Sequence, residues 1–280
     1  MTNPPLAAAS RLPQTEENSP VAHLDAGGEG SGFENQSVTR VGQILALFGP
    51  PTTELSAGDI AERLELNRTT AYRYCASLVT AGILERGRRR GTFILGGLML
   101  ELGIHALDRK RVLDIAPPYL RALSTTAGAT AVLSLWGAQG PIVALVEEDR
   151  RTVLVTVRPG AHLGMTSAQM HVFLAHHRDP FTVERILGSL SAAERSDVEA
   201  AVYAARRTGY AISRFRQSLF GLAVPVFDDY GVNATIALLG SDQSTDLTPS
   251  SPVLAALQRT ATAIGDELGR GEGESVVRSS

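Results

Sequence analysis

The most regular pattern of apolar and polar residues lies between positions 55 and 95, where two short amphipathic stretches precede a glycine and two strand-like segments. Ser56 and Asp59 have the spacing of a capping box, so a helix is predicted to begin near Ala57. Its apolar residues recur three and four positions apart and therefore share one face. They are Ile60, Ala61 and Leu64. The period breaks after Leu64, which predicts a short helix.

A second helix is predicted from Arg68 to Ala81, with Asn67 as its N-cap and Gly82 as its stop. Its apolar residues form one stripe, which leaves the polar side chains of its first turns facing away from the core. Such side chains suit the DNA major groove, since Arg bonds guanine, Asn bonds adenine, and Thr or Tyr reaches a phosphate or a thymine methyl. The predicted contacts here are Ser56, Asn67, Arg68, Thr69, Thr70, Tyr72 and Arg73.

Two strands are predicted at Ile83–Arg86 and Thr92–Leu95, on either side of a loop that holds three consecutive arginines. Arg88, Arg89 and Arg90 are expected to contact the phosphate backbone. Two short helices alone are also common as plain core architecture. The cationic hairpin beside a polar helix favours a winged helix-turn-helix that binds double-stranded DNA.

With these elements included, the chain resembles the IclR family of bacterial transcriptional regulators from about Ser37 to Leu268. The resemblance is carried by the order and spacing of several segments. They are SVTRVGQIL at 37–45, RTTAYR at 68–73, LVTAGIL at 78–84, TFILG at 92–96 and the helical stretch 98–107. It implies an α+β protein in which an N-terminal winged helix-turn-helix is joined by a linker helix to a C-terminal GAF-like domain that binds an effector.

A chain of 280 residues is long enough for two domains. Its formal net charge of −3 would argue against binding to nucleic acid only if the charge were spread evenly over the chain. The basic residues are concentrated at 68–90 instead. Cys75 is the only cysteine, which excludes an internal disulfide and a zinc site built on several thiolates. No signal peptide or membrane-spanning run is apparent, so a cytoplasmic protein without membrane partners is expected.

The expected organisation has five parts. They are a disordered extension (1–36), the winged helix-turn-helix (37–97), a linker helix (98–112), the effector-binding and oligomerisation domain (113–268) and a disordered tail (269–280). A further helix is predicted over 114–126, broken near Pro117 and Pro118.

In the second domain, an antiparallel meander of three strands is predicted first. A pair of helices, a hairpin of two strands and a last helix then follow. The strands are expected at 131–136, 142–147, 152–157, 223–227 and 234–239, and the helices at 168–176, 192–208 and 251–268. Sequence patterning alone supports only a domain with a sheet and helices.

The family resemblance also implies an effector pocket, whose positions are carried over where the sequence aligns. They are Gly160, Ser167, Ser213, Arg214, Leu222, Ala237 and Leu239. Apolar side chains stand at several positions where the family has polar ones, which removes hydrogen-bond partners for a small organic acid. Arg214 and Arg216 then either contact an anionic part of a larger apolar ligand or are surface charges, and the pocket could also be empty of any ligand.

The sequence gives little support for a catalytic site or a metal site. His171, His176 and His177 are five and one apart, whereas a shared helical face needs three or four. No phosphate loop or nucleophile elbow is found, so no enzyme and no cofactor are expected.

The sequence thus predicts a DNA-binding regulator that acts as a repressor under a small-molecule effector. It would bind a near-palindromic operator as a homodimer or homotetramer. One alternative keeps the DNA reader but gives the second domain only an oligomerisation role. The other is a small-molecule enzyme with a helical dimerisation module.

Overall fold

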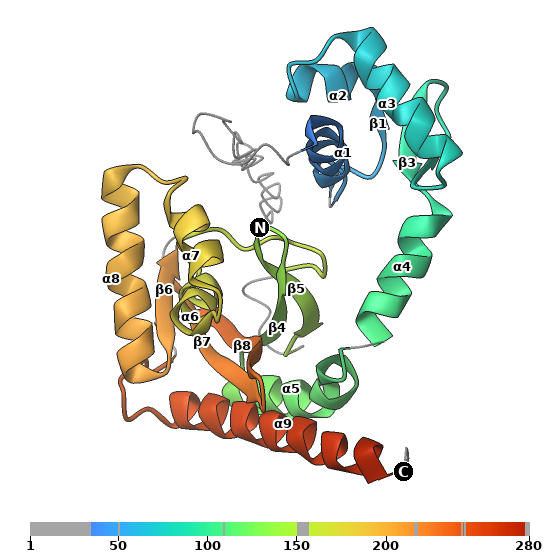
Figure 1. Ribbon diagram of the computed structural model, residues 1–280. Coiled ribbons are helices and arrows are strands. Elements are labelled where there is room, and N and C mark those ends of the chain that lie inside the picture. The colour runs from blue at the N-terminus through green and yellow to red at the C-terminus, as the bar shows by residue number, and fades with distance from the viewer. Residues whose placement is uncertain are drawn as a thin grey trace, which may run out of the picture. The chain divides into compact units, whose positions relative to one another are not determined.

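The computed structural model describes residues 35–277, apart from positions 50, 109, 150–156, 216–217, 242 and 244 (Figure 1). The extension expected over residues 1–36 falls outside these residues, except for its last two positions. Side chains from position 270 onward are likewise outside them. No helix among the residues described is long and apolar enough to cross a membrane.

The N-terminal part, called here the reader domain (residues 36–95), is a winged helix-turn-helix, as the sequence predicted. It consists of three helices and a three-stranded antiparallel sheet in which β3 lies between β1 and β2. The elements are α1 (Gln36–Ala46), β1 (Leu55–Ser56), α2 (Ala57–Arg63), α3 (Arg68–Thr80), β2 (Leu84–Arg86) and β3 (Thr92–Leu95).

Local capping explains where the reader helices begin. Ser56 Oγ accepts a hydrogen bond from Asp59 N at 3.1 Å, and the Asp59 carboxylate accepts one from Ser56 N at 2.8 Å. Both bonds of the predicted capping box are therefore present. Asn67 caps α3 through Thr69 N at 2.8 Å. Gly82 follows α3 with φ +73°, a conformation that glycine adopts without strain.

The core of the reader domain gathers one buried face from each element. Ile44, Ile60, Cys75, Leu84 and Phe93 are each fully buried in it. Burial raises the pKa of the Cys75 thiol to about 11. The thiol is therefore protonated at neutral pH and fills space as a small apolar side chain.

Where a linker helix was predicted over 98–112, the structure has helix α4 (Gly97–Asp108), and α5 (Val112–Ala127) comes next. The break expected near Pro117 and Pro118 is wrong, because α5 runs through both residues. Each proline removes one helical N–H donor. Burial of one face of α5, with Leu120 and Leu123 in the core, offsets that loss.

The C-terminal domain (residues 112–277) is a three-layer α+β fold around a five-stranded antiparallel sheet of order β5-β4-β8-β7-β6. Helices α5 and α9 pack on one face of the sheet, and α6 and α8 pack on the other (Figure 1). The strands are β4 (Thr130–Gly137), β5 (Gly140–Glu147), β6 (Ala211–Phe215), β7 (Leu219–Asp228) and β8 (Gly231–Ser241). The helices are α6 (Ala168–His176), α7 (Pro180–Leu187), α8 (Ala192–Thr208) and α9 (Pro252–Val277).

Most predicted elements of this domain are present, with differences at four places. The third strand of the predicted meander lies almost wholly outside the described residues, since 150–156 are not among them. The edge strand β6 and the short helix α7 were not predicted. Helix α9 continues to Val277, so the predicted end at Leu268 and the predicted disordered tail from 269 are wrong.

Candidate DNA-binding interface and effector region

The first turns of α3 expose the polar side chains that the sequence assigned to DNA. Arg68, Thr69, Thr70 and Arg73 are all exposed, whereas Ala71, Cys75 and Leu78 form the buried side of the helix. Thr69 and Arg73 are four residues apart and therefore neighbours on the outer face. Ser56 and Asn67 lie at the helix starts, and their side-chain oxygens are used as caps.

Arg68 and Tyr72 are held against the protein. A Cβ built on Gly58 would lie 2.8 Å from Arg68 Nη2, so the guanidinium rests over the start of α2. Tyr72 Oη accepts a hydrogen bond from Arg86 Nη2 at 3.3 Å, and the Arg86 guanidinium lies 5.0 Å from the Phe93 ring centroid. Arg73 is thus the arginine of α3 that stands on the outer face away from these packing contacts.

The loop between β2 and β3 exposes Arg88, Arg89 and Arg90, as predicted. It is fastened at its base by Glu54, a residue that no pattern in the sequence had indicated. The Glu54 carboxylate accepts hydrogen bonds from the Thr92 hydroxyl and from Arg89 N at 3.0 Å, and Arg89 Nε lies 3.6 Å from Glu54 Oε2. Arg89 therefore has part of its charge balanced within the protein.

The fastening by Glu54 should weaken in acid. The hydrogen bond from Thr92, followed by the one from Arg89 N, lowers the pKa of Glu54. A carboxyl with a depressed pKa stabilises the fold above its unfolded pKa, and that contribution is lost as the pH falls through the folded pKa. We expect the protection of the Arg89 amide from hydrogen exchange to fall below about pH 4.3, the ordinary pKa of glutamate.

A Glu54→Gln variant provides the control for this prediction. Its Arg89 amide should be less protected already at neutral pH and should show no acid-dependent step. The amide of Leu78, in the last turn of α3, should keep its protection in both proteins. An identical pH profile in the variant and the original protein would contradict the role of Glu54.

The junction between the reader domain and α4 is tightly built. Gly96 N donates to Ile83 O at 2.8 Å, and Leu98 N donates to Gly82 O at 3.2 Å. Glu85 Oε1 accepts from Gly97 N at 2.8 Å, which places a negative charge at the start of α4, where the helix dipole favours it. The turn after α3 is therefore hydrogen-bonded directly to the start of the linker helix.

In the C-terminal domain, the predicted effector residues do not form one group. Ser213 Oγ accepts from Ala168 N at 3.2 Å, beside the α6 cap Ser167, so both lie on the α6 side of the sheet. Ala237 packs with α6 and α8 on that side, and Leu239 lies there too. Gly160 has φ +85°, and its N–H donates a hydrogen bond to Val143 O of β5. Strand β5 is at the opposite edge of the sheet from β6, so Gly160 lies far from Ser213.

Leu222 and Arg214 are placed on the other face. Leu222 is buried in the core formed with α5 and α9. Arg214 is on the same side, because successive residues of a strand point to opposite faces and Ser213 points toward α6. The position in β7 that faces the other predicted residues is Gly221. A Cβ built there would lie 3.0 Å from Ser213 Oγ and 3.4 Å from Leu239 Cδ2.

A buried polar group that the sequence did not predict lies between α6 and the sheet. Gln169 Nε2 donates to Thr235 O at 3.3 Å and to Thr235 Oγ1 at 3.1 Å. Thr235 pairs across the strands with Ser134, whose buried Oγ has no hydrogen-bond partner within the described part of the chain. These three polar residues come from α6, β8 and β4. A sequence alone does not show that they share a face, because that depends on the strand register.

The three histidines of this region take separate positions. His171 Nε2 lies 2.8 Å from Met165 O, and burial lowers the pKa of His171. His176 packs edge-on against Phe227, and burial lowers its pKa too. His177 packs against Trp136. The described part of the chain holds no group of three or more His, Cys, Asp or Glu side chains that could bind a metal ion.

Comparisons with known proteins agree with this architecture. The family model for the IclR helix-turn-helix domain matches residues 37–88. The DNA-binding transcriptional repressor YiaJ of Escherichia coli strain K12 is 25% identical over 255 residues, which is 84% of this chain and 88% of that protein.

Solved structures share the fold. A protein assigned as an IclR transcriptional regulator from Silicibacter sp. TM1040 superposes with a TM-score of 0.73 at 23% identity, over 83% of this chain and 96% of that chain. An IclR homologue from Microbacterium hydrocarbonoxydans, crystallised with 4-hydroxybenzoate, superposes with a TM-score of 0.65 at 23% identity, over 83% and 98%.

A helix-turn-helix with a basic wing, followed by a linker helix and an α+β domain, is the architecture of a DNA-binding transcriptional regulator. Residues 37–88 match the helix-turn-helix domain of the IclR family, and the chain is similar to YiaJ and to solved IclR regulators over more than four fifths of its length.

Proposed function

We propose that this protein is a sequence-specific repressor that inserts α3 into the major groove of its operator. The observation that carries the proposal is the exposed face of α3 with Thr69 and Arg73, beside a wing loop that exposes three arginines. Side chains on α3 would read base edges, and the wing would contact flanking phosphates. Repression as the direction of control is supported by the relative YiaJ, which is named as a repressor.

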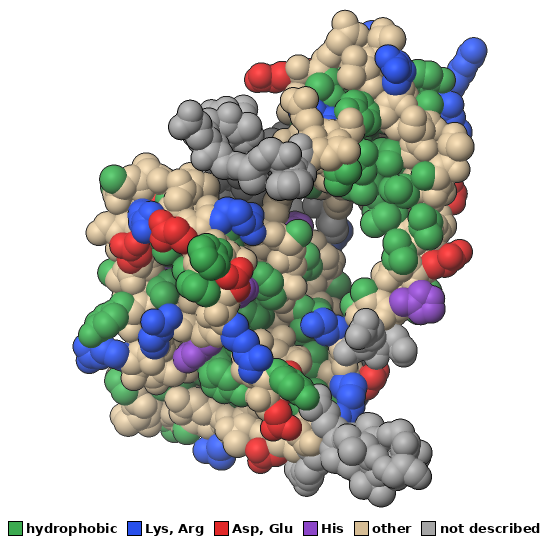
Figure 2. All heavy atoms as spheres, in the orientation of Figure 1, with side chains coloured by type: hydrophobic (Ala, Val, Ile, Leu, Met, Phe, Trp, Pro, Cys, Tyr) green, Lys and Arg blue, Asp and Glu red, His purple; other side chains and the backbone are tan. Residues whose placement is uncertain are grey.

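The regulator would act as a homo-oligomer on a near-palindromic site. Helix α4 exposes Leu100, Ile104 and Leu107, and Leu100 is 67% exposed. Their spacing of four and three is that of a coiled-coil seam, so the same face of a second copy would cover them. Figure 2 shows hydrophobic side chains gathered over α4. Two readers joined in this way would meet two half-sites.

A small-molecule effector would act through the C-terminal domain, without catalysis. Support comes from the Microbacterium homologue, which was crystallised with 4-hydroxybenzoate. The α6 face would be the site, around Ser213, Gly221 and Leu239. A ligand can shift operator affinity only if it binds one arrangement of the readers more tightly than another. The alternative is a domain that only oligomerises.

The test of the DNA proposal is a salt titration of binding to the upstream region of the protein's own gene and to a scrambled duplex of the same composition. Tighter binding to the upstream region, with a steep dependence on salt, is the expected result. Equal and weak binding to both duplexes would count against a sequence-specific regulator. The effector proposal is tested separately. Organic acids such as 4-hydroxybenzoate are added to the protein, and one that binds the folded state should raise the midpoint of its unfolding.

Removing the wing arginines should flatten the salt dependence. In an Arg88→Ala/Arg90→Ala double variant, each lost phosphate contact should reduce the slope of log K against log salt by about 0.9. The four side chains of a dimer would then account for up to about 3.6. Affinity should fall to the same extent for the upstream and scrambled duplexes, because phosphate contacts carry no sequence information.

The matched control for the wing variant is Arg185→Ala, which removes an exposed arginine from α7 of the C-terminal domain. Its salt slope should equal that of the original protein. A wing variant that loses affinity for the upstream duplex alone would show that these arginines read sequence instead of charge.

A further inference from the structure

One arginine of the reader domain outside the wing loop is held in place between α3 and the sheet. The Arg86 guanidinium lies 5.0 Å from the Phe93 ring centroid and 5.7 Å from that of Tyr72. Its Nη2 donates a hydrogen bond to Tyr72 Oη at 3.3 Å. The two rings meet edge to face, with 6.4 Å between their centroids. Contacts from both α3 and β3 therefore orient the guanidinium before any partner binds.

Most of the hydrogen-bonding capacity of Arg86 and Tyr72 is left for a partner. A guanidinium has several N–H donors, and the contact with Tyr72 takes one of them. The Tyr72 hydroxyl accepts that bond, so its own proton remains to be donated. Within the described part of the chain, no carboxylate forms an ion pair with Arg86, whereas Arg89 has Glu54. Tyr72 is 48% exposed and Arg86 is exposed, so both reach solvent.

The pair lies between the two parts of the reader domain that are proposed to contact DNA. Tyr72 comes directly before Arg73 and three residues after Thr69, so it borders the outer face of α3. Arg86 is the last residue of β2, and the run of wing arginines begins two positions later. The edge of a major groove is the sugar–phosphate backbone. A backbone that runs from α3 to the wing would therefore cross Tyr72 and Arg86.

We propose that Arg86 and Tyr72 form a phosphate clamp, which binds one DNA phosphate between α3 and the wing. The inference rests on the DNA binding proposed above. It adds Arg86, which is not among the predicted contacts, and it assigns Tyr72 to a phosphate instead of a thymine methyl. Arg86 supplies the charge and a bidentate pair of N–H donors, and the Tyr72 hydroxyl donates to the same phosphate. The bond from Arg86 polarises that hydroxyl and strengthens it as a donor.

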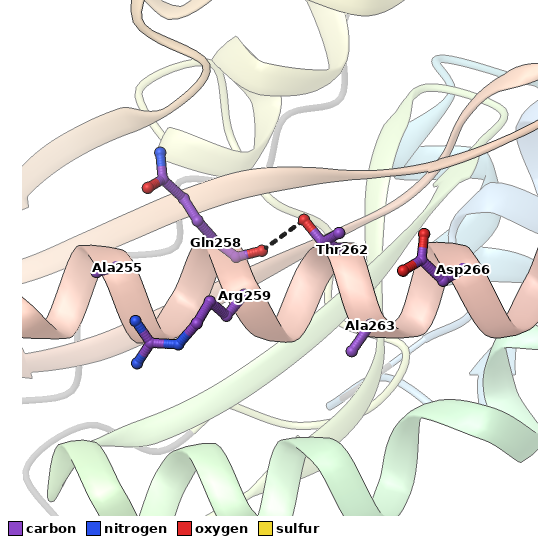
Figure 3. A pocket seen from close by; sticks show the side chains of 6 residues that line it. All are labelled: Ala255, Gln258, Arg259, Thr262, Ala263 and Asp266. Carbon is purple, nitrogen blue, oxygen red and sulfur yellow. Dashed lines mark hydrogen bonds between the residues drawn. The ribbon is translucent and has the colours of Figure 1, made fainter.

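Two exposed arginines of the C-terminal domain show what sets Arg86 apart. Arg259, on α9, borders an open concavity of about 540 Å³ (Figure 3). The residues that line it are Ala255, Gln258, Arg259, Thr262, Ala263 and Asp266. None of them is aromatic, and Asp266 carries the charge opposite to that of Arg259. Arg207 lies 5.9 Å from the Tyr203 ring centroid, but α8 provides both residues. At Arg86, stacking and a hydrogen bond coincide with a position beside the proposed DNA-binding face.

Salt titration with the scrambled duplex tests the clamp, because a phosphate contact needs no operator. Arg86→Ala in the full-length protein should reduce the slope of log K against log salt by about 0.9 for each bound reader domain, or about 1.8 for a dimer. Arg86→Lys keeps the charge and should keep the slope. It should nevertheless bind about two- to tenfold more weakly, since an ammonium group lacks the planar, bidentate geometry. An unchanged slope in Arg86→Ala would overturn the proposal.

The Tyr72 hydroxyl supplies a second readout that does not involve charge. Tyr72→Phe keeps the ring and should bind both duplexes about two- to tenfold more weakly, with the salt slope unchanged. In the double variant Y72F/R86A the two losses should not add, because both groups bind one phosphate and the hydroxyl depends on Arg86. Full additivity, or a Tyr72→Phe protein that binds as tightly as the original, would contradict the clamp.

The matched control is Arg207→Ala, which removes an exposed arginine from above a tyrosine ring in the C-terminal domain. Its salt slope should equal that of the original protein. The unfolding midpoint of each variant, measured without DNA, separates a lost contact from a damaged fold. If Arg86→Ala does not fold, Arg86→Gln takes its place, since its planar amide lacks the charge and the same loss of slope is expected.

The clamp and the sequence-specific regulator fail separately. The regulator is scored by the preference for the upstream duplex over the scrambled one, whereas the clamp is scored by the salt slope on the scrambled duplex. An original protein without that preference, whose slope still falls on Arg86→Ala, would keep the clamp and lose the regulator. An Arg86→Ala protein that loses affinity for the upstream duplex alone would assign Arg86 to a base and overturn the clamp.

Discussion

Replacing Arg73 by alanine is expected to reduce the preference for the operator over scrambled DNA by about 5- to 140-fold per half-site, equivalent to about 1–3 kcal/mol. Arg73 is exposed on the outer face of α3, whereas the guanidinium of Arg68 rests over Gly58. A bidentate pair with guanine would be lost, and the affinity for scrambled DNA would change little. Competition binding with the two duplexes at one salt concentration measures this ratio.

The wing variant Arg88→Ala/Arg90→Ala is the comparison that gives this result its meaning. Both proteins lose arginines from the reader domain, but only the α3 variant should change the ratio between the duplexes. An Arg73→Ala protein that weakens both duplexes equally would assign Arg73 to the phosphate backbone. In that case Thr69, its neighbour on the outer face, would be the next candidate for contact with a base.

The reader domain could be predicted closely because its signals are local. Ser56, Asp59 and Asn67 are within three residues of the amides they cap, so the sequence alone specifies where α2 and α3 begin. The role of Glu54 could not be predicted in this way. It is fastened to residues 35 and 38 positions away, and nothing in a single sequence indicates that pairing.

The two prolines of α5 show how tertiary contacts override a local rule. Pro117 and Pro118 predict a break because each lacks a donor. The helix nevertheless continues, since its buried face packs on the sheet and its N-cap residue and its middle are tied to α9. Tyr119 Oη donates to Glu267 Oε2 at 2.7 Å, and Arg111 Nη1 donates to Leu268 O at 3.0 Å. These contacts are about 150 residues distant in sequence and are invisible to patterning.

The effector region was harder to predict because it depends on which face of a strand a residue occupies. A shift of one position moves a side chain to the opposite face of the sheet, and this is the difference between Leu222 and Gly221. The unpredicted edge strand β6 had the same consequence for Ser213 and Arg214, which point to opposite sides. Register, which a single sequence did not reveal here, decides which residues share a site.

Under the proposed function, a change in the C-terminal domain would reach the DNA through the junction between the reader domain and α4. Leu98 N and Gly97 N are bonded to the turn after α3 and to β2, respectively. Movement of the start of α4 would therefore move α3 with it, with little freedom between them. Gly96 makes this possible, because a side chain there would separate the two segments.

Substituting Gly96 by alanine should consequently have a large effect. A Cβ at this position would lie 2.4 Å from Gly82 O and 3.0 Å from Leu84 C, and backbone atoms cannot move aside as a flexible side chain can. We expect the free energy of unfolding of the reader domain to fall by about 1–3 kcal/mol, the usual cost of overpacking. Gly42→Ala is the matched control, because nothing lies within 4 Å of its Cβ and it is in the helix α1.

The control should be more stable than the original protein by about 0.5–1 kcal/mol, the usual gain from alanine over glycine inside a helix. Urea unfolding followed by far-ultraviolet circular dichroism reports on both domains, and fluorescence of Trp136, the single tryptophan, reports on the C-terminal domain. Gly96→Ala should shift only the dichroism transition, with faster hydrogen exchange at the amides of Gly96 and Leu98. If those two amides kept their protection and the transition did not move, the junction would not be the rigid connection that its hydrogen bonds indicate.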